Sequence, residues 1–436
     1  MKKISQSPVI GIVAEYNPFH NGHALHIARA REFLKNRGAD NVPVVVVLSS
    51  NFTQRGLPAL ADKWTRARMA LSNGVDLVLE LPFAYACNAA PEFARGAVDI
   101  LAATRFVTHL SFGMENVATS LKPTSLKPIS SKPGFAIDAI TNILIHESCA
   151  FKRDLKKKLS EGKSYPKALA ETLDGIIPGS GAFVSMPNNS LALSYLLRVL
   201  EKNHDLELLP VQRQGAGHHD KAGGPLSSAA AIRSALAEIG DASWNGLWIQ
   251  KAMPASSLAL LEEERKSGRL WMRTEKLWAL LQGLLARSSP EELRGCAGMN
   301  EGLENLFLKR YVEATSYEDF IGRCVCARYT RSRLQRQATR CLVGVDRWTA
   351  LALSRNGPPY IRVLGYTSRG RDLLRARRQI SHAALNAIPV VTRLAAAQSP
   401  AARASAALEF RASRFRELLL PRPDLRHEEK QRPVAL

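Results

Sequence analysis

The segment that most constrains the fold joins a short apolar run, residues 9–14, to the sequence His20-Asn21-Gly22-His23. An apolar run of this length fits a buried strand, and the residues from Gly22 onward have helical spacing. The two histidines therefore stand where a strand gives way to a helix. The first turn of a helix offers N–H groups and the positive end of the helix dipole, which together attract anions. The pattern predicts a phosphate site early in an α/β fold.

Strand and helix patterns alternate through the first part of the chain. A continuous apolar run at residues 44–48 and strand-like segments at residues 77–81 and 107–112 predict three further strands, and helical spacing covers residues 63–72 and 90–103. Continuous apolar runs separated by helices are typical of a parallel sheet that is buried on both faces. We therefore expect an α/β fold whose N-terminal domain is Rossmann-like with a parallel sheet.

The later part of the chain is patterned mainly for helices. The change falls near residue 250, so we expect one domain over residues 1–250 and a helical C-terminal domain over residues 251–420. Residues 385–397 are expected to form one of its helices. Residues 421–436 are highly charged and are expected to form a disordered tail.

The charge of the chain points to a polyanionic partner. The formal net charge is +21 over 436 residues, and arginines greatly outnumber acidic residues beyond about residue 320. Such a field attracts polyanions, which release their counterions on binding, so nucleic acid is the first candidate. A generally basic surface with no specific partner is the alternative explanation.

Composition also bounds the cellular setting. Hydrophobic residues make up 46% of the chain, and no apolar run is long enough to cross a bilayer. The basic start runs into a short strand and not into a signal peptide, so we expect a cytoplasmic protein without a membrane partner. The six cysteines are scattered, which argues against a disulfide scaffold.

The two histidines suit the chemistry of a transferring phosphoryl group. Such a group spreads negative charge over its oxygens, so catalysis consists mainly of positioning and of donors aimed at that charge. Gly22 between the histidines lets the backbone approach phosphates closely. The alternatives are that His20 and His23 are zinc ligands or helix caps. Since no cysteine lies near them and a closed zinc site normally needs four ligands, we assign no metal ligand.

A series of further motifs follows in a fixed order along nearly the whole chain. Beyond residues 15–23 they occupy residues 50–56, 62–64, 80–83, 112–115, 165–168, 187–189, 228–233, 301–305 and 328–333. In order and spacing they resemble the tRNA(Met) cytidine acetate ligase family. The His-x-Gly-His motif by itself resembles only the wider nucleotidylyltransferase superfamily.

The resemblance implies a fold and a reaction. It implies a nucleotidylyltransferase-like, ATP-binding catalytic domain at residues 1–250 and a tRNA-binding domain at residues 251–420. The implied enzyme is a ligase that activates acetate as acetyl-adenylate and passes the acetyl group to N4 of the wobble cytidine of elongator tRNA(Met). ATP is then the co-substrate, and Mg²⁺ is expected to accompany it.

The resemblance also implies the residues of the ATP site. His20 and His23 are the expected catalytic residues. The expected ATP-binding residues are Val13, Ala14, Glu15, Tyr16, Asn17, Pro18, Phe19, His20, Asn21, Gly22, His23, His26, Gly113, Asn188, Asn189, Ser228, Ile232 and Arg233. Spacing alone does not choose between the two asparagines. Ala230 stands where the superfamily usually has threonine, which removes one hydroxyl donor.

Two further groups complete the expected site. Candidate substrate-pocket residues near the carboxyl edge of the sheet are Asn51, Arg55, Asp62 and Lys63. Asp62 has a capping role as an equal alternative. Candidate RNA-binding residues around one helix start are Arg328, Arg331, Arg333 and Arg336, with a basic solvated face as the alternative. Cys326-Ala327 replaces lysines that the family normally carries there.

Three rival functions remain open from the sequence. The first is a nucleotidylyltransferase that makes a dinucleotide cofactor, which would leave the basic helical part without a use. The second is an acetate ligase that acts on the citrate lyase carrier protein. The third is a catalytically silent RNA-binding protein of the same fold.

Overall fold

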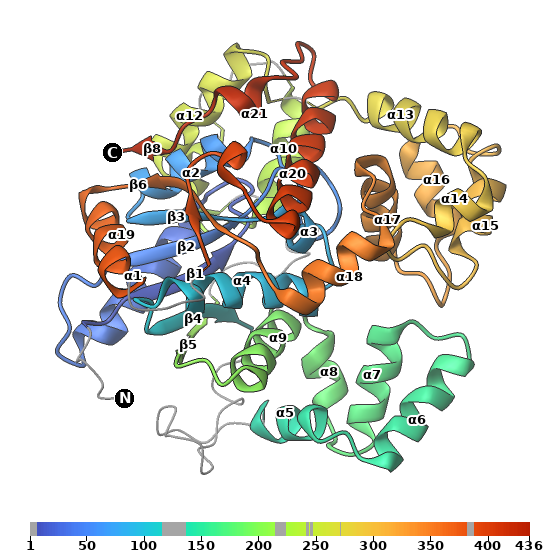
Figure 1. The fold of residues 1–436 in the computed structure, drawn as a ribbon, viewed down its shortest axis with the longest axis horizontal. Helices are drawn as coiled ribbons and strands as arrows, with labels where there is room; N and C mark the ends of the chain where they lie inside the picture. Colours follow the sequence, from blue (N-terminus) through green and yellow to red (C-terminus); the bar gives the residue numbers. More distant parts are fainter. Residues whose placement is uncertain are drawn as a thin grey trace.

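A mostly parallel sheet forms the centre of the protein, and helices surround it (Figure 1). The computed structural model describes residues 7–115, 137–213, 224–240, 244, 247–270, 272–381 and 388–436. The strand order is β5-β4-β1-β2-β3-β6-β7, and β8 pairs with β6. The parallel strands are β1 (Ile10–Ala14), β2 (Val44–Ser49), β3 (Leu77–Leu81), β4 (His109–Met114) and β5 (Glu207–Gln212). The α/β fold with a parallel sheet is therefore confirmed.

The sheet is covered on both faces by hydrophobic clusters. In β2, Val45 and Val47 belong to one hydrophobic cluster, while Val44 and Val46 belong to another. Successive side chains of a strand point to opposite faces, so each cluster is the core on one side. The predicted helices are present as α2 (Lys63–Ser72) and α4 (Ala90–Thr104), which pack on opposite sides.

The order of the strands fixes where a ligand can bind. From β1 the chain moves through β2 to β3 on one side, and then returns to β4 and β5 on the other side of β1. Ligands of such sheets bind at the carboxyl ends of the strands where the order reverses. In this protein that point lies between β1 and β4. Helix α1 (Asn21–Lys35) begins there, directly after β1.

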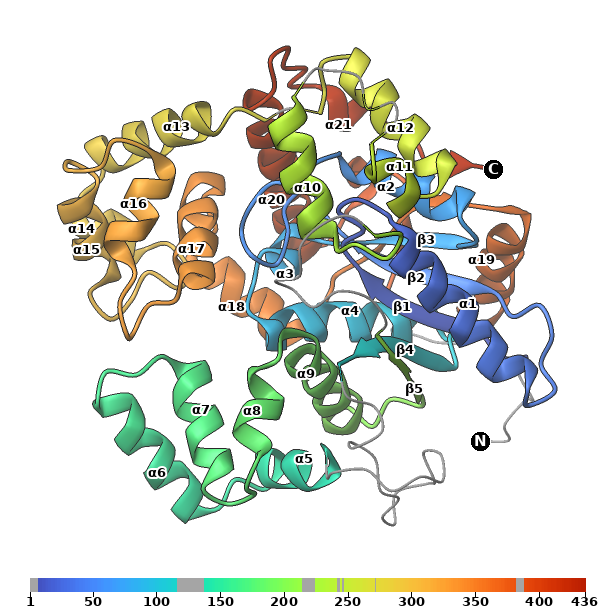
Figure 2. The same cartoon turned by 180° about the vertical axis from the view of Figure 1, so that it is seen from behind.

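Helices inserted between β4 and the later strands form two groups. One group lies beside the sheet and contains α5 (Ile137–Ile145), α6 (Cys149–Ser160), α7 (Tyr165–Asp174), α8 (Ser180–Ser185) and α9 (Pro187–Glu201). The other group contains α10 (Ala229–Ile239), α11 (Ile249–Ala252) and α12 (Ala255–Lys266). Seen from behind, α10 and α11 lie near the start of α1 (Figure 2). The Asn21 amide ties them together by donating to the carbonyls of Pro225 and Lys251 at 3.0 and 2.8 Å.

A helical module stands off the sheet, as the sequence predicts for the later part of the chain (Figure 1). Its helices are α13 (Thr274–Arg287), α14 (Pro290–Arg294), α15 (Leu303–Arg310), α16 (Tyr317–Cys324) and α17 (Arg331–Val343). They share a hydrophobic cluster of their own, which includes Leu281, Phe307 and Phe320. We call α13–α17 the helical module.

After the helical module the chain returns to the sheet, which the sequence analysis did not anticipate. The returning elements are α18 (Arg347–Asn356), β6 (Ile361–Tyr366), α19 (Ser368–Ser381), β7 (Val390–Val391) and α20 (Pro400–Leu418). Strand β6 pairs antiparallel with β3, and α20 packs against α3 (Phe83–Ala86). The sheet thus takes strands from both sides of residue 250, and the division at that residue stays a prediction.

Two local expectations are wrong. Residues 388–397 form β7 and a short 3₁₀ helix (Leu394–Ala396), and not the predicted helix, because Pro389 cannot continue one; residues 385–387 lie outside the described part. The tail expected to be disordered contains α21 (His427–Lys430) and β8 (Val434–Ala435). His427 and Glu428 pair with the buried Asp62 and Lys63, so the charge content of the tail does not predict its structure. In the described ranges, no helix has the length and apolar character needed to span a bilayer.

Candidate nucleotide-binding site

The start of α1 is capped by the two histidines of the first motif. His20 is the N-cap residue, and its Nδ1 accepts a hydrogen bond from the N–H of Gly22 at 3.0 Å. His23 Nδ1 in turn accepts from the N–H of His20 at 3.2 Å. Because Nδ1 is an acceptor in both rings, the neutral rings carry their proton on Nε2. The capping alternative is therefore correct for Nδ1, and it leaves two Nε2–H groups with fixed orientation.

Burial keeps these imidazoles neutral. The pKa of His20 is lowered to about 4, mainly by burial and further by the charges of Arg213 and Arg233. Burial and the neighbouring His20 hold the pKa of His23 well below its usual range. The pKa of His26 is likewise lowered to about 4, mainly by burial. At neutral pH all three rings are hydrogen-bond donors without charge.

Aromatic packing and a buried hydroxyl hold the rings in place. The centroids of the His20 and His23 rings lie 3.9 Å apart, and Tyr16 meets the His23 ring edge-on at 4.8 Å. His26 Nε2 lies 2.9 Å from Ser111 Oγ on β4. The site is therefore built across β1, α1 and β4, at the reversal of strand order.

The positive charge of the site comes from arginines. Arg233 on α10 donates from Nη1 to the carbonyl of Asn17 at 2.6 Å. Arg213, directly after β5, donates to Asn188 Oδ1 at 2.9 Å. The exposed Arg55 lies near enough to Arg233 to contribute to the lowering of its pKa, although burial is the larger cause. Guanidinium groups beside neutral imidazoles suit a polyphosphate.

The structure distinguishes the two asparagines. Asn189 is fully buried, and its Oδ1 accepts from the N–H of Glu115 at 3.1 Å. Asn188 is half-buried and lies between Glu115 and Arg213, beyond Gly113 at the end of β4. Asn188 therefore faces the site, while Asn189 holds the end of β4 in place.

The remaining expected residues differ in how much they expose. Val13, Ala14 and Glu15 are half-buried at the end of β1, whereas the segment from Tyr16 to Phe19, which includes Asn17 and Pro18, is buried. Ser228 caps α10 by accepting from the N–H of Ala231 at 3.2 Å. Ile232 lies in the hydrophobic core, so its side chain cannot contact a ligand.

The loop after β2 holds the histidine segment from behind. Glu15 Oε1 accepts from the N–H of Gln54 at 2.7 Å, and Asn17 Oδ1 accepts from the N–H of Leu60 at 2.8 Å. The buried Arg66 donates to the carbonyl of Glu15 at 2.6 Å. These contacts fix the turn that places His20.

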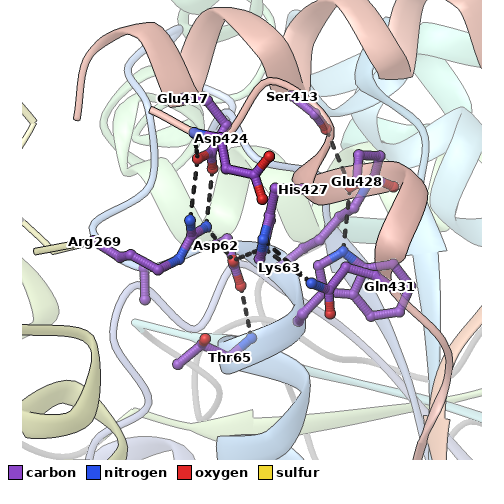
Figure 3. A network of polar contacts seen from close by, with 12 residues as sticks. Asp62, Lys63, Thr65, Arg269, Ser413, Glu417, Asp424, His427, Glu428 and Gln431 are labelled. Carbon is purple, nitrogen blue, oxygen red and sulfur yellow. Dashed lines mark hydrogen bonds and ion pairs between the residues drawn. The ribbon is translucent and has the colours of Figure 1, made fainter. Parts of the chain in front are cut away.

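Figure 3 shows two of the four candidate substrate-pocket residues, Asp62 and Lys63, in a closed polar network, and hydrogen bonds to Lys63 and Ser413 connect Asn51 to it. Asp62 caps α2, because its Oδ1 accepts a hydrogen bond from the N–H of Thr65. Asp62 Oδ2 lies 3.2 Å from Arg269 Nη2 and 2.8 Å from His427 Nε2. Asn51 accepts from the Lys63 N–H and donates to Ser413. This geometry favours the capping alternative for Asp62. Of the four residues, only Arg55 is exposed near the histidines.

Lys63 is the centre of a buried ion cluster. Its Nζ contacts the carboxylates of Glu80, Glu409 and Glu428, the latter two at 2.8 and 2.9 Å, and its side chain has no exposed surface. Burial acts to lower the pKa of Lys63, but the three carboxylates outweigh burial and raise it. We call Lys63, Arg362 and these three glutamates the buried ion cluster.

The candidate RNA-binding arginines separate into two groups. Arg328 is exposed, Arg331 pairs with Glu318, and Arg333 pairs with Glu301 at 3.1 Å. Arg336 faces the sheet-containing part instead, and its Nη1 lies 3.4 Å from the carbonyl of Gln54. Arg328 and Arg333 both lie beside Tyr329, whereas Arg331 turns towards α16 through Glu318, and Arg336 joins the module to the loop behind the histidines.

Sequence reasoning missed Arg213 and Arg66. Arg213 would have been found if residues 207–212 had been recognised as a strand, because the residue that follows such a strand lies at the carboxyl edge. Arg66 shows no such signal, since its carbonyl partners belong to distant loops. No group of three or more metal-binding side chains occurs in the part of the chain that the structure describes.

Comparison with known proteins adds three findings. Residues 7–432 match the family described as HIGH Nucleotidyl Transferase. The tRNA(Met) cytidine acetate ligase of Caldicellulosiruptor saccharolyticus is 38% identical over 376 residues, which cover 85% of this chain and 84% of that protein. Two crystal structures of Thermotoga maritima TmcAL superpose over 98% of this chain and 99% of theirs: the apo form I at TM-score 0.85 and 28% identity, and form II bound with α-thio ATP at TM-score 0.82 and 29% identity.

Proposed function

Because the chain belongs to the tRNA(Met) cytidine acetate ligase family of HIGH nucleotidyl transferases, we propose that it ligates acetate to a tRNA cytidine with ATP. The acceptor is N4 of the wobble cytidine of elongator tRNA(Met), and the intermediate is acetyl-adenylate. The observation that carries the proposal is the pair of neutral, oriented imidazoles at the start of α1. Because the proposed substrate is a tRNA, we also propose that the protein acts in the cytoplasm.

The first step forms the mixed anhydride. An acetate oxygen attacks the α-phosphorus of ATP, and the bond to the pyrophosphate oxygen breaks. Negative charge grows on the oxygens of the α-phosphoryl group, and the Nε2–H groups of His20 and His23 donate to them. Arg213 and Arg233 stabilise the phosphates, including the departing pyrophosphate.

The nucleotide lies across the reversal of strand order. The half-buried end of β1 and Gly113 on β4 form its two sides, and Asn188 presents an amide to it. The cap of α10 at Ser228 directs the N–H groups of that helix start towards the phosphates. Ala230 supplies no hydroxyl there, so Arg233 carries more of the phosphate binding.

Mg²⁺ fits this site only together with the nucleotide. The described residues contain no group of three or more metal-binding side chains, and Glu15 and Glu115 each use one carboxylate oxygen to accept from Gln54 and Asn188. Mg²⁺ bound together with the nucleotide would neutralise part of the triphosphate charge. The protein's own donors orient the α-phosphate.

The second step transfers the acetyl group. The N4 amine of the cytidine attacks the acetyl carbonyl, AMP leaves with the bonding electrons, and N4 loses a proton. Arg328, Arg331 and Arg333 present positive charge on the helical module for the RNA backbone. The helical module touches the loop that holds the histidines, so RNA bound to the module is brought near the adenylate.

Acetate-dependent exchange of pyrophosphate into ATP tests the first step. We expect exchange with acetate alone, without RNA. Exchange that requires nicotinate mononucleotide or another phosphate ester instead would favour a cofactor-forming nucleotidylyltransferase. Acetyl transfer to a carrier protein but not to tRNA would favour the carrier-protein ligase, and the absence of any exchange would favour a silent RNA-binding protein.

A further inference from the structure

A polar cavity lies in the helical module, apart from the histidine site. Its volume is about 240 Å³, and its lining includes Arg294, Asn300, Glu301, Glu304 and Arg347. Small-molecule pockets usually measure roughly 300–1,000 Å³, so this cavity suits one flat ring or one small polar group. Four of its eight lining residues carry a charged side chain.

Glu304 gives the cavity an unused acceptor. The residue is only 4% exposed, and its Oε1 accepts from Arg294 Nε at 3.0 Å. Its Oε2 is buried and has no hydrogen-bond partner among the described residues. A buried carboxylate oxygen without a donor is costly, and a ligand that brings an N–H group removes that cost. A donor that reaches this oxygen from the cavity is therefore stabilised there.

Arg347 and Trp348 are the first two residues of α18, and Arg347 lines the same cavity as Glu304. The Arg347 guanidinium makes no hydrogen bond or ion pair within the described ranges. Trp348 follows it and is 73% exposed, the highest fraction among the exposed large apolar side chains of those ranges. An exposed tryptophan next to an arginine is the combination that binds unstacked bases and phosphates.

The cavity is continuous with the surface already expected to bind RNA. Arg333 donates to Asn300 Oδ1 and to Glu301 Oε2, both at 3.1 Å, and both partners line the cavity. The guanidinium of Arg333 also lies 5.0 Å from the centroid of the Tyr329 ring. A polyanion that follows Arg328, Arg331 and Arg333 therefore reaches the cavity directly.

We propose that this cavity binds one unstacked nucleotide of the tRNA substrate. The base donates an amino hydrogen to Glu304 Oε2, Arg347 binds a phosphate, and Trp348 stacks on a neighbouring base. Guanine, adenine and cytosine carry such an amino group, whereas uracil does not. Arg294 is a positioning residue, since it holds the Glu304 carboxylate through Oε1. This inference rests on the proposed tRNA substrate and adds a contact away from the adenylate.

Binding of unmodified elongator tRNA(Met) to the full chain tests the proposal. We expect Trp348→Ala and Glu304→Gln each to weaken binding about tenfold, since stacking on one base contributes roughly 1–3 kcal/mol and a lost buried acceptor costs a similar amount. Glutamine keeps an oxygen for Arg294 but turns an N–H towards the base. Arg347→Ala should weaken binding and reduce its dependence on salt concentration.

The matched control is Arg375→Ala, which removes an exposed arginine from α19 on the other side of the molecule. The control should bind tRNA like the wild type, and acetate-dependent pyrophosphate exchange should be unchanged in all four variants. If a thermal unfolding measurement shows that Glu304→Gln does not fold, the binding of Arg347→Ala and Trp348→Ala decides the test, because both residues are exposed.

The outcomes separate this inference from the proposed function. If the wild type acetylates tRNA and the cavity variants bind it as tightly as the Arg375→Ala control does, the cavity proposal is wrong and the proposed function stands. If the wild type forms acetyl-adenylate but binds no tRNA, the tRNA substrate is wrong and the cavity proposal falls with it. Binding of a carrier protein that depends on Trp348 would also overturn the nucleotide as occupant.

Discussion

The histidine site and the buried ion cluster are both polar and both buried, yet they treat charge in opposite ways. His20 lies beside the His23 ring, Arg213 and Arg233 without a carboxylate partner, so burial removes its charge at neutral pH. Lys63 is more deeply buried, but three carboxylates surround it and keep it charged. The difference shows that partners, and not burial alone, decide whether a buried group is ionised.

The difference also separates structural from functional polarity. In the buried ion cluster the polar atoms are largely paired within the protein, so the cluster joins β3, α2, α20 and α21. In the histidine site each ring uses Nδ1 to cap the helix and keeps Nε2–H for a ligand. Donors that need no reorganisation are what stabilisation of a developing charge requires.

The largest effect should follow from removing Lys63. Lys63→Met leaves three buried carboxylates without their common cation, which should lower the free energy of unfolding by about 3–5 kcal/mol. Urea unfolding measures this change. The control is Lys156→Met, at an exposed lysine on α6, and a loss for Lys63→Met within 1 kcal/mol of this control would show that the cluster is not a stabilising unit.

The next effect concerns catalysis. His23→Ala removes one oriented donor, which should slow acetate-dependent pyrophosphate exchange by about 10²–10³-fold, while the loss of the cap lowers stability by only about 1 kcal/mol. His146→Ala, at an exposed histidine, is the matched control. Exchange at the wild-type rate in His23→Ala would show that His23 does not stabilise the transition state of the first step.

The two regions should also give pH dependences of opposite sign. The pKa of His20 is lowered to about 4 from an ordinary 6.5, so the unfolded chain binds its proton first and stability falls as pH drops from 6.5 towards 4. Between pH 6.5 and 5 this amounts to roughly 2 kcal/mol. His20→Gln should remove that dependence, as seen in urea unfolding at several pH values.

Glu409 supplies the opposite case. Burial and the nearby Glu80 raise its pKa from 4.5 to about 7, so the stability that it contributes is fully present below pH 4.5 and is lost as pH rises towards 7. Glu409→Gln should therefore remove a contribution to the free energy of unfolding that falls as pH rises. The test is the change in the slope of unfolding free energy against pH, variant minus wild type. Changes of the same sign for His20→Gln and Glu409→Gln would contradict the comparison.

The smallest effect concerns the loop between the two regions. Gly56 has φ +87°, and a Cβ there would lie 2.5 Å from the backbone nitrogen of Arg336. Gly38 has φ +85° with open space around it, which makes Gly38→Ala a control for the backbone cost alone. Gly56→Ala should lose at least about 1 kcal/mol more than Gly38→Ala, because the helical module must shift. Equal losses would mean that the contact with Arg336 is not tight.

Local patterns were enough to predict the first strands, α2, α4 and the start of α1. Each of these depends on residues close in sequence: an apolar run, a cap such as Asp62, or helical spacing. Strand β6 was not predicted, because Arg362 interrupts its apolar pattern. That arginine can be buried because it pairs with Glu80, 282 positions away, and with Glu428. The structure of the tail was not predicted for the same reason, since its charged residues His427 and Glu428 pair with Asp62 and Lys63. Partners that are distant in sequence leave no local signal.

The candidate site was predictable in part for a related reason. The histidine motif is contiguous, so its place at a strand-to-helix junction could be read directly. Arg213 comes to the same site from β5, about 190 positions later, and the choice between Asn188 and Asn189 depends on which one the end of β4 covers. Such choices are made by packing between elements, which the sequence does not display.

Acetate-dependent labelling of tRNA tests the central claim most directly. The purified protein is incubated with ATP, radiolabelled acetate and bulk tRNA that lacks the modification, and the digested RNA is analysed for acetylated cytidine. We predict label in N4-acetylcytidine from elongator tRNA(Met), and its loss in His23→Ala. Formation of acetyl-adenylate without any label in RNA would contradict the proposed function.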